Sequence, residues 1–433
     1  MQLIIGIALA AAASAPHGIN PAVPLAVENG DTVRAFGSAV VSRRTTAQSL
    51  WMILALRGGT AGVSELPSPV IVGGAVADLL ASPTSGTRLI LHTSNPGTLT
   101  VSAGGVGRNI AEGLARLGCN PRFISAVGKD DLGEMVLASL AKLAADGAPI
   151  CAAGVVEVEG MRTATYSALM DERNDLCAAV ADMAVHDAIS PAQLAAHEAA
   201  IASAPLVVCD ANLSPEALVA LATLTTKHQV PLWLEPTSVP KGAAAVKALH
   251  DAGLLGAVSY TSPNDDEVTA MAAALPDPDA TSTGIGVSET GDSIRRFYRR
   301  LRAQAAGDND DALRSAAVKL VRAGIHDVLV TRGARGVLWA RGEPEGETLC
   351  EEHAAAAVNE VVSTRGAGDA FVGGAVTQLI TEARAGRQAH SVASVRAAVG
   401  AGLSAARLTV MSEDAVPPEL TQASIGLALS TED

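Results

Sequence analysis

The sequence predicts an α/β fold in which a mainly parallel central sheet is flanked by helices, with a small β flap beside it. Short apolar runs typical of buried strands alternate with alanine-rich stretches typical of helices along most of the chain. The 433 residues are 48% hydrophobic and 18% charged, so the chain can bury a large core. A mean hydropathy of +0.29 argues against intrinsic disorder as the default state.

The regular pattern begins with residues 69–74, a β-branched run that ends in two glycines and is predicted to be a buried strand. Residues 110–117 have the spacing of an amphipathic helix that stops at Gly118. Further strands are predicted at 122–127, 206–209, 232–235, 257–260 and 327–331. Parallel sheets bind ligands at the carboxyl ends of their strands, so the residues that follow these runs are candidates for a site.

Three stretches depart from the alternation. Residues 88–101 and 155–180 hold short strand-like pieces around turns, and we expect them to form an antiparallel flap, or lid, outside the main sheet. Such a flap excludes water from a site. Residues 277–311 are rich in Pro, Asp, Thr and Gly around a basic patch at 295–300, and we interpret them as a surface insertion.

Residues 1–66 differ from the rest in composition. Residues 3–15 resemble the core of a signal peptide, but no Lys or Arg precedes them, and they are too short to span a bilayer. Residues 32–64 contain arginines and no acidic residue, which is typical of an organelle transit peptide. Two explanations stay open, a targeting segment for an organelle or a disordered extension of a cytoplasmic protein. We take 67–412 as the folded domain and 413–433 as a C-terminal tail.

Charge and composition exclude several classes of partner. Lys plus Arg number 31 and Asp plus Glu number 45, and the resulting net charge of −14 disfavours attraction to nucleic acid or to anionic membranes. Only 2% of residues are aromatic, which leaves little material for stacking on bases. The five cysteines are scattered without a C-x-x-C motif, so they predict neither a zinc site nor a disulfide framework. We therefore expect a small-molecule ligand.

The most informative motif is Ser-Thr-Arg-Gly-Ala-Gly-Asp-Ala-Phe at residues 363–371. Gly366 and Gly368 let the backbone approach a phosphate, and the start of the helix that follows would offer N–H groups and partial positive charge to an anion. Asp369 could then take the proton from an attacking hydroxyl. The alternative is that Asp369 only caps its helix.

A second cluster precedes the helix predicted at 110–117. It combines Asp78, the turn at 94–97 and a glycine-rich run at 102–109 that ends in Asn109. A carboxylate and an amide can together read adjacent hydroxyls of a sugar, since Asp accepts hydrogen bonds while Asn both donates and accepts them. The alternatives are that Asn109 caps its helix and that Asp78 caps the turn into Leu79.

The order of these motifs resembles the PfkB, or ribokinase-like, family of carbohydrate and nucleoside kinases over residues 68–409. Gly-Gly-Val-Gly-Arg-Asn at 104–109 is similar to the N-terminal signature of the family, and Gly-Ala-Gly-Asp-Ala-Phe at 366–371 is similar to its C-terminal signature. The segments at 128–133, 264–267 and 331–336 resemble intermediate motifs. Within the family, residues 92–97 and 210–213 are most similar to pseudouridine kinases.

The resemblance implies an enzyme that uses ATP and Mg²⁺ to phosphorylate the 5′-hydroxyl of pseudouridine. The alternatives are a family member that acts on another nucleoside or sugar, such as ribose, adenosine or a fructose phosphate, and a sensor that binds without turnover. A flap strand in this family often pairs with a second subunit, so a homodimer through the lid is also expected, although the sequence does not give the oligomeric state.

The resemblance also assigns roles by position. The catalytic base is Asp369, and the anion hole for the transferred phosphate is Gly366, Ala367 and Gly368. The acceptor is held by Asp78, Asn95, Gly104, Gly105, Asn109 and Asn212. ATP is held by Thr331, Gly333 and Gly336, and Mg²⁺ is organised through water by Asn264 and Glu267. The residues alone leave other interpretations open: a helix start at 264–267, a strand-to-turn connection at 331–336 and a simple turn at 210–213.

Two departures from family patterns limit these expectations. Ser363 stands where many family members have an acid that helps to hold a monovalent cation, which leaves dependence on potassium open. The sequence has no G-x-x-x-x-G-K-[ST] motif, so the chain is not a P-loop kinase.

Overall fold

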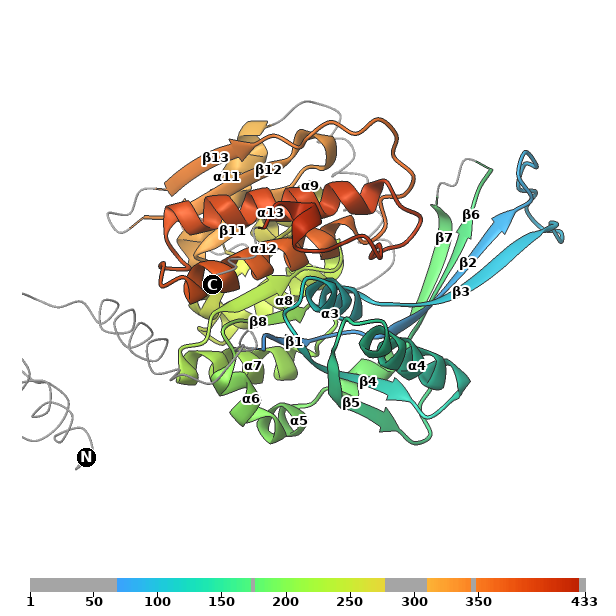
Figure 1. Cartoon of the computed structure of the whole chain (residues 1–433), viewed down its shortest axis with the longest axis horizontal. Helices are drawn as coiled ribbons and strands as arrows, with labels where there is room; N and C mark the ends of the chain where they lie inside the picture. Colours follow the sequence, from blue (N-terminus) through green and yellow to red (C-terminus); the bar gives the residue numbers. More distant parts are fainter. Residues whose placement is uncertain (1–67, 173–175, 277–309, 344–347, 428–433) are drawn as a thin grey trace, which may run out of the picture. The chain divides into compact units, whose positions relative to one another are not determined.

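Within the residues that the structure describes, the centre of the fold is a nine-stranded sheet in the order β13-β12-β11-β10-β9-β8-β1-β4-β5 (Figure 1). The structure is a computed structural model that describes residues 68–172, 176–276, 310–343 and 348–427. Neighbouring strands from β5 to β11 run parallel, while β12 and β13 pair antiparallel at one edge. The predicted class, a mainly parallel sheet flanked by helices, is confirmed.

All six apolar runs predicted as strands are strands of this sheet. Their bounds are β1 (Val70–Val72), β4 (Arg122–Gly128), β8 (Val207–Asp210), β9 (Leu232–Glu235), β10 (Val258–Thr261) and β11 (Asp327–Thr331). The sequence analysis did not predict the antiparallel edge, which is formed by β12 (Val337–Gly342) and β13 (Thr348–His353).

Helices cover both faces of the sheet, because successive strand residues point to opposite sides. Val70 and Val72 belong to one buried cluster, whereas Ile71 between them belongs to another. The Ile71 side packs against α3 (Val106–Arg116), α4 (Asp131–Ala145), α12 (Ala367–Arg384) and α13 (Val392–Val410). The other side packs against α5 (Pro191–Ala196), α6 (Glu198–Ser203), α7 (Pro215–His228), α8 (Val239–Asp251), α9 (Asp265–Ala274) and α11 (Asp310–Ala323).

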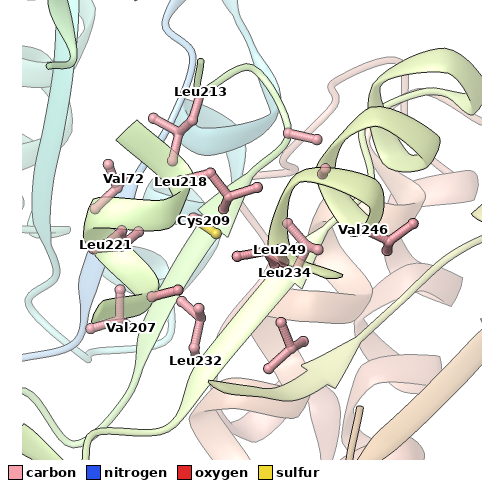
Figure 2. Close-up of a cluster of buried hydrophobic side chains, with 14 of the residues drawn as sticks. Val72, Val207, Cys209, Leu213, Leu218, Leu221, Leu232, Leu234, Val246 and Leu249 are labelled. Carbon is pink, nitrogen blue, oxygen red and sulfur yellow. The ribbon is translucent and has the colours of Figure 1, made fainter. Parts of the chain in front are cut away.

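Figure 2 shows part of the second cluster, where β8 and β9 meet the helices that follow them. Side chains of Val207 and Leu232 face Leu221 of α7, and Leu249 of α8 lies beside Leu234. Each of these side chains is almost completely removed from solvent. Burial of this kind contributes roughly 1.5–3 kcal/mol for each large aliphatic side chain and keeps the carboxyl ends of the strands in place.

The lid is a separate four-stranded sheet in the order β3-β2-β6-β7 (Figure 1). Its strands are β2 (Val76–Pro83), β3 (Gly97–Gly104), β6 (Thr165–Met170) and β7 (Leu176–Asp182). The existence of the lid was predicted, but its bounds need correction. Residues 151–158 form β5, which pairs with β4 in the main sheet, and β2 lies outside both stretches that were predicted to form the lid.

The segment predicted as a C-terminal tail is packed as far as the structure describes it. Val416, Leu420 and Ile425 are buried in a cluster with Leu117. The side-chain amide of Gln422 donates a hydrogen bond to the carbonyl oxygen of Leu117 at 2.6 Å. Residues 413–427 therefore belong to the folded domain, because their apolar side chains cover the end of α3.

Two predictions lie mainly or wholly outside the described residues, namely the extension at 1–66 and the insertion at 277–311. The end of the predicted insertion needs correction, since α11 already begins at Asp310. Among the residues with a described position, no helix combines the length and apolarity needed to cross a bilayer.

Candidate active site

The starts of α3 and α12 meet in space, although they are far apart in the sequence. Asn109 of α3 donates a hydrogen bond from Nδ2 to Oδ2 of Asp369, the third residue of α12, at 2.9 Å and across 260 positions. The two helices pack directly against each other. The amide and the acid that the sequence analysis assigned to one site are thus in direct contact.

The capping alternatives for these residues are wrong. Gly366 is the N-cap of α12 and Gly105 is the N-cap of α3, so Asp369 and Asn109 lie inside their helices. Asp78 caps no turn, because it lies within strand β2 and pairs with Ser102. All three polar side chains are therefore placed by regular secondary structure.

The carboxyl group of Asp369 is electrostatically unusual. The surrounding protein, which removes most of its water, raises its pKa from 3.8 to about 7. The hydrogen bond from Asn109 acts in the opposite direction, while the charges of Asp78, Asp210 and Glu267 raise the pKa further. A carboxyl with a pKa near neutrality can both accept and release a proton at physiological pH.

Asp78 reaches the site from the lid. Burial raises its pKa to about 6, and the positive charges of Arg365 and Arg108 oppose that rise. A β-carbon at Gly104 would lie 2.1 Å from Oδ2 of Asp78, so only glycine leaves room for this carboxylate. Gly104 and Asp78 are thus parts of one arrangement, as the sequence analysis expected.

Asp210, at the end of β8, forms hydrogen bonds with the turn after β1, the start of α3 and the turn after β8. Its Oδ2 accepts hydrogen bonds from the N–H groups of Gly74 and Gly107, each at 2.8 Å. Its Oδ1 accepts from the N–H of Asn212 at 3.0 Å. The carboxylate is completely buried, and it fixes the start of α3 against the ends of β1 and β8. From the sequence, Asp210 was predicted only as part of a turn, and this anchoring role was not predicted.

Asn212 lies beside the turn after β1. Its Nδ2 is 2.8 Å from the point that a β-carbon of Gly74 would occupy, and its Oδ1 accepts a hydrogen bond from Nζ of Lys241. Burial lowers the pKa of Lys241, while the charge of Asp210 opposes that shift. Residues 211 and 212 form the turn that the alternative predicted, and the side chain of Asn212 also belongs to the polar group at the strand ends.

Asn95 is not brought to this group. Its side chain bonds to the backbone of Ile90 and Thr93 within the loop that joins β2 to β3. From Asp78 the chain follows strand β2 to its end at Pro83 before that loop begins, a path of roughly 17 Å at the usual rise per residue. Within the described chain, Asn95 organises the tip of the lid.

The start of α12 offers backbone N–H groups, of which that of Ala367 also donates to the carbonyl oxygen of Thr364 at 3.4 Å. Gly366 adopts a left-handed conformation with φ 73°, and a β-carbon there would lie 2.1 Å from the carbonyl oxygen of Ala415. At Gly368 a β-carbon would meet no described atom within 4 Å, so the space beside it is open. The first N–H groups of a helix lack intrahelical partners, and together with the helix dipole they attract anions. Ala367 and Gly368 lie in this first turn.

Asn264 and Glu267 form a capping box at the start of α9. Oδ1 of Asn264 accepts from the N–H groups of Asp266 and Glu267, and Oε2 of Glu267 accepts from the N–H of Asn264 at 2.9 Å. The interpretation of 264–267 as a helix start is therefore confirmed. Glu267 is nevertheless buried, and burial is the main cause of its raised pKa.

Glu235, at the end of β9, was missed by the sequence analysis. It is buried, and its Oε2 accepts a hydrogen bond from the hydroxyl of Ser262 at 2.5 Å. Burial and then the charge of Glu267 raise its pKa well above the ordinary value. A glutamate at the end of an otherwise apolar strand is the sequence signal that could have identified it, because ligands bind at the carboxyl ends of parallel strands.

Among the described residues, no group of three or more His, Cys, Asp or Glu side chains has the arrangement of a metal site.

The segment at 331–336 lies next to this helix start. The N–H of Thr331 donates to the carbonyl oxygen of Pro263 at 2.8 Å, and Thr331 pairs with Asn264 as an isolated bridge. Gly333 and Gly336 begin and close the turn into β12, with a hydrogen bond of 3.0 Å between them. A β-carbon at Gly333 would meet no described atom within 4 Å. The strand-to-turn interpretation is confirmed, and the turn has open space beside it.

Comparison with known proteins identifies several relatives. Residues 70–421 match the model of the pfkB family carbohydrate kinases. The chain is 29% identical to a pseudouridine kinase of Arabidopsis thaliana over 81% of this chain and 92% of that protein. It is 34% identical to a pseudouridine kinase of Escherichia coli over 40% of this chain and 52% of that protein. The ribokinase structure from Giardia lamblia has 19% identity and a TM-score of 0.64, and the match covers 84% of this chain and all of that one.

Proposed function

Since the chain belongs to the pfkB family of carbohydrate kinases, we propose that it transfers the γ-phosphate of ATP to the 5′-hydroxyl of pseudouridine. Membership makes the chain a phosphotransferase with a hydroxyl acceptor. Pseudouridine is proposed because the Arabidopsis pseudouridine kinase aligns with most of both chains. The observation that carries the mechanism is the contact between Asn109 and Asp369.

Asp369 acts as the general base. The 5′-hydroxyl of the acceptor loses its proton to this carboxylate as its oxygen bonds to the γ-phosphorus, and the bond from that phosphorus to the β–γ bridging oxygen breaks to release ADP. The N–H groups of Gly366, at the N-cap of α12, and of Ala367 and Gly368, in its first turn, receive the negative charge that develops on the phosphoryl oxygens, with Ala367 giving up its 3.4 Å hydrogen bond to Thr364. Proximity and electrostatic stabilisation supply most of the rate.

The acceptor is held by residues of the lid and by residues at the start of α3. Asp78 and Asn109 present a carboxylate and an amide whose pattern of donors and acceptors suits neighbouring ribose hydroxyls. Gly104 leaves room for the Asp78 carboxylate and Gly105 for the carbonyl oxygen of Gly74, so both glycines support the groups proposed to hold the acceptor. Asn212, which accepts a hydrogen bond from Lys241, is proposed to contact polar atoms further along the nucleoside. Asn95 is not part of this proposal for a single chain, because its side chain serves the tip of the lid.

ATP and Mg²⁺ are proposed beside α9 and the turn after β11. The open space at Gly333 suits a nucleotide ribose or phosphate, with Thr331 and Gly336 on the same turn. Asn264 does not fit as a direct metal ligand, since its oxygen already accepts two N–H groups. Glu267 fits an outer-sphere role, because one carboxylate oxygen remains for a water of the hydrated ion. A bound Mg²⁺ would neutralise charge on the phosphates.

The acceptor is tested by supplying ATP with pseudouridine, uridine, adenosine, ribose or fructose 6-phosphate and measuring ADP formation. We expect pseudouridine to give the highest kcat/KM. A higher value for any other acceptor would replace pseudouridine in the proposal while leaving the kinase intact. Binding of pseudouridine that raises Tm without ADP formation would instead support the sensor.

The outer face of the lid favours a homodimer. Residues paired across a sheet share a face, and the pairs Leu79–Val101, Leu79–Ser167 and Ser167–Val180 place these four residues on the face opposite Asp78. Val180 is 73% exposed, and Val101 is also exposed. Apolar side chains grouped on an exposed sheet face are typical of a protein interface. We propose that a second copy of the chain covers this face.

Replacing Val180 with lysine is therefore expected to convert the dimer into monomer, because burial of the new charge at the interface is unfavourable. Sedimentation velocity measures the change. A matched control is Met411→Lys, which alters an exposed apolar residue just after α13 and leaves the sedimentation coefficient unchanged. A parent protein that is already monomeric at micromolar concentration would contradict the proposed dimer.

A further inference from the structure

Arg108 has no assigned role, although it lies at the centre of the site. It is the third residue of α3, directly before Asn109, and only 8% of it is exposed. Its backbone N–H donates to the carbonyl oxygen of Gly74 at 3.1 Å, so its main chain is held by the turn after β1. A long cationic side chain that is buried at this point needs partners.

The partners of Arg108 are a carboxylate and an amide. Its Nη1 lies 2.5 Å from Oε2 of Glu112, one helical turn further along. The same Nη1 donates to Oδ1 of Asn109 at 3.3 Å. The other oxygen of Glu112 accepts from Arg116, at 2.9 Å from Nε and 2.6 Å from Nη2. Both oxygens of Glu112 thus hold an arginine, and this restricts the position of the Arg108 guanidinium.

This arrangement makes the two ends of the Asn109 amide inequivalent. Arginine has only donors, so Nη1 can form a hydrogen bond with the amide oxygen but not with the amide nitrogen. When the oxygen faces Arg108, the nitrogen faces Asp369 and donates to it at 2.9 Å. A half-turn of the amide would place its oxygen against the Asp369 carboxylate and its N–H groups against the guanidinium. Both contacts would be repulsive when Asp369 is ionised, the state in which it acts as the base.

We infer that Arg108 is a positioning residue for phosphoryl transfer, which selects the orientation of the Asn109 amide that presents an N–H group to Asp369. The inference rests on the proposed function, in which Asp369 is the base. Arg108 itself touches neither the acceptor nor ATP in this scheme. It acts through one amide, and its own position is maintained by Glu112.

Two other roles for Arg108 make different predictions. Its Nε is buried and has no hydrogen-bond partner among the described atoms, so direct contact with a substrate is one alternative. That role would raise the KM of the acceptor and leave kcat nearly unchanged. The second alternative is a helix-stabilising ion pair with Glu112, which would change Tm but not kcat. The matched control for it is Arg116, which pairs with the same glutamate and, among the described residues, shows no hydrogen bond to Asn109.

A double-mutant cycle tests the inference. We expect Arg108→Met to lower kcat about tenfold, because the amide is then free to rotate. In an Asn109→Ala background the same substitution should change kcat by less than about twofold, since there is no amide left to orient. Arg116→Met should leave kcat unchanged, and Arg108→Lys should restore part of the loss through its own donor group. Circular dichroism and Tm establish that each variant is folded.

Three results would overturn the inference: an equal loss of kcat in both backgrounds, an effect confined to KM, or equal effects of Arg108→Met and Arg116→Met. The experiment also separates this inference from the proposed function. If the parent chain phosphorylates no acceptor, the proposed function fails. The inference is then tested by measuring the pKa of the Asp369 carboxyl by carbon-13 NMR in the parent, the two single variants and the double variant.

In that measurement Arg108→Met and Asn109→Ala should each raise the pKa of the Asp369 carboxyl, and the double variant should raise it no further. Asn109→Ala removes the N–H donor to Asp369 and Arg108→Met lets that donor turn away, while the negative charges that face Asp369, those of Asp78, Asp210 and Glu267, are retained. An unchanged pKa in Arg108→Met would also overturn the inference.

Discussion

Replacing Asp369 with asparagine is expected to lower kcat by about 10²–10⁴-fold, the usual contribution of a general base. Asparagine keeps the size of the side chain and still fills the space beside Asn109, but it cannot take the proton of the acceptor hydroxyl. ATP-dependent product formation measures the loss. The control is Asp131→Asn, which alters an exposed acid in the first turn of α4 and should leave kcat unchanged. Near-parental turnover of the Asp369 variant would remove this residue from the mechanism.

The same carboxyl sets the expected dependence on pH. Its pKa in the folded chain is about 7, so most molecules carry a protonated Asp369 at pH 6 and cannot accept a proton. The kcat/KM of the parent, which reports on the free enzyme, should rise through about pH 7 and then level off. A flat profile between pH 6 and pH 8 would contradict the assignment.

The loss of activity in Asp369→Asn should come with a gain in stability. A carboxyl whose folded pKa exceeds its unfolded value opposes folding more and more as pH rises from the unfolded value to the folded one. Above about pH 7 the full penalty applies to the parent and is absent from the asparagine variant. The variant should therefore have the higher Tm at pH 8 and a smaller advantage at pH 5. This pattern separates a catalytic defect from unfolding.

Replacing Asp210 with alanine should have the largest effect on stability. Three N–H groups, those of Gly74, Gly107 and Asn212, lose their acceptor. Each buried donor left without a partner costs about 1–3 kcal/mol, so the free energy of unfolding should fall by at least about 3 kcal/mol. Urea denaturation measures the change. Turnover should also fall, because the start of α3, which places Asn109, loses its anchor.

Two further variants sharpen this test. Asp210→Asn keeps an acceptor oxygen and should lose less stability than the alanine variant. Asp251→Ala removes an exposed acid at the end of α8 and should change the free energy of unfolding by less than about 0.5 kcal/mol. If alanine at 210 and alanine at 251 had equal effects, Asp210 would not be the anchor of the site.

Much of the sheet could be predicted from the sequence because the signals for its parallel strands are local. Runs such as 206–209 are apolar throughout, as expected for strands buried on both faces. Whether a strand joins the main sheet or the lid is not determined by local sequence. Residues 151–158 have a strand-like composition, but their pairing with β4 rather than with the lid depends on the positions of both sheets.

The start of a helix likewise depends both on local sequence and on tertiary contacts. The sequence analysis began the first helix at residue 110, four residues late, because Gly105 and Gly107 are poor helix formers. In the folded chain, Asp210 accepts the N–H of Gly107 across 103 positions and stabilises the earlier start. That contact carries Asn109 from a predicted cap into the helix, where its side chain meets Asp369.

The sequence by itself determined the fold class, the family motifs and the residue types of the site, because periodic burial and short glycine-rich motifs are written in neighbouring residues. Tertiary structure decided which of those residues meet. It joined Asn109 to Asp369, left Asn95 at the tip of the lid, and added Asp210, Glu235 and Arg108. The physical reason is that pKa shifts, buried hydrogen bonds and amide orientation depend on atoms that are distant in sequence and in contact only after folding.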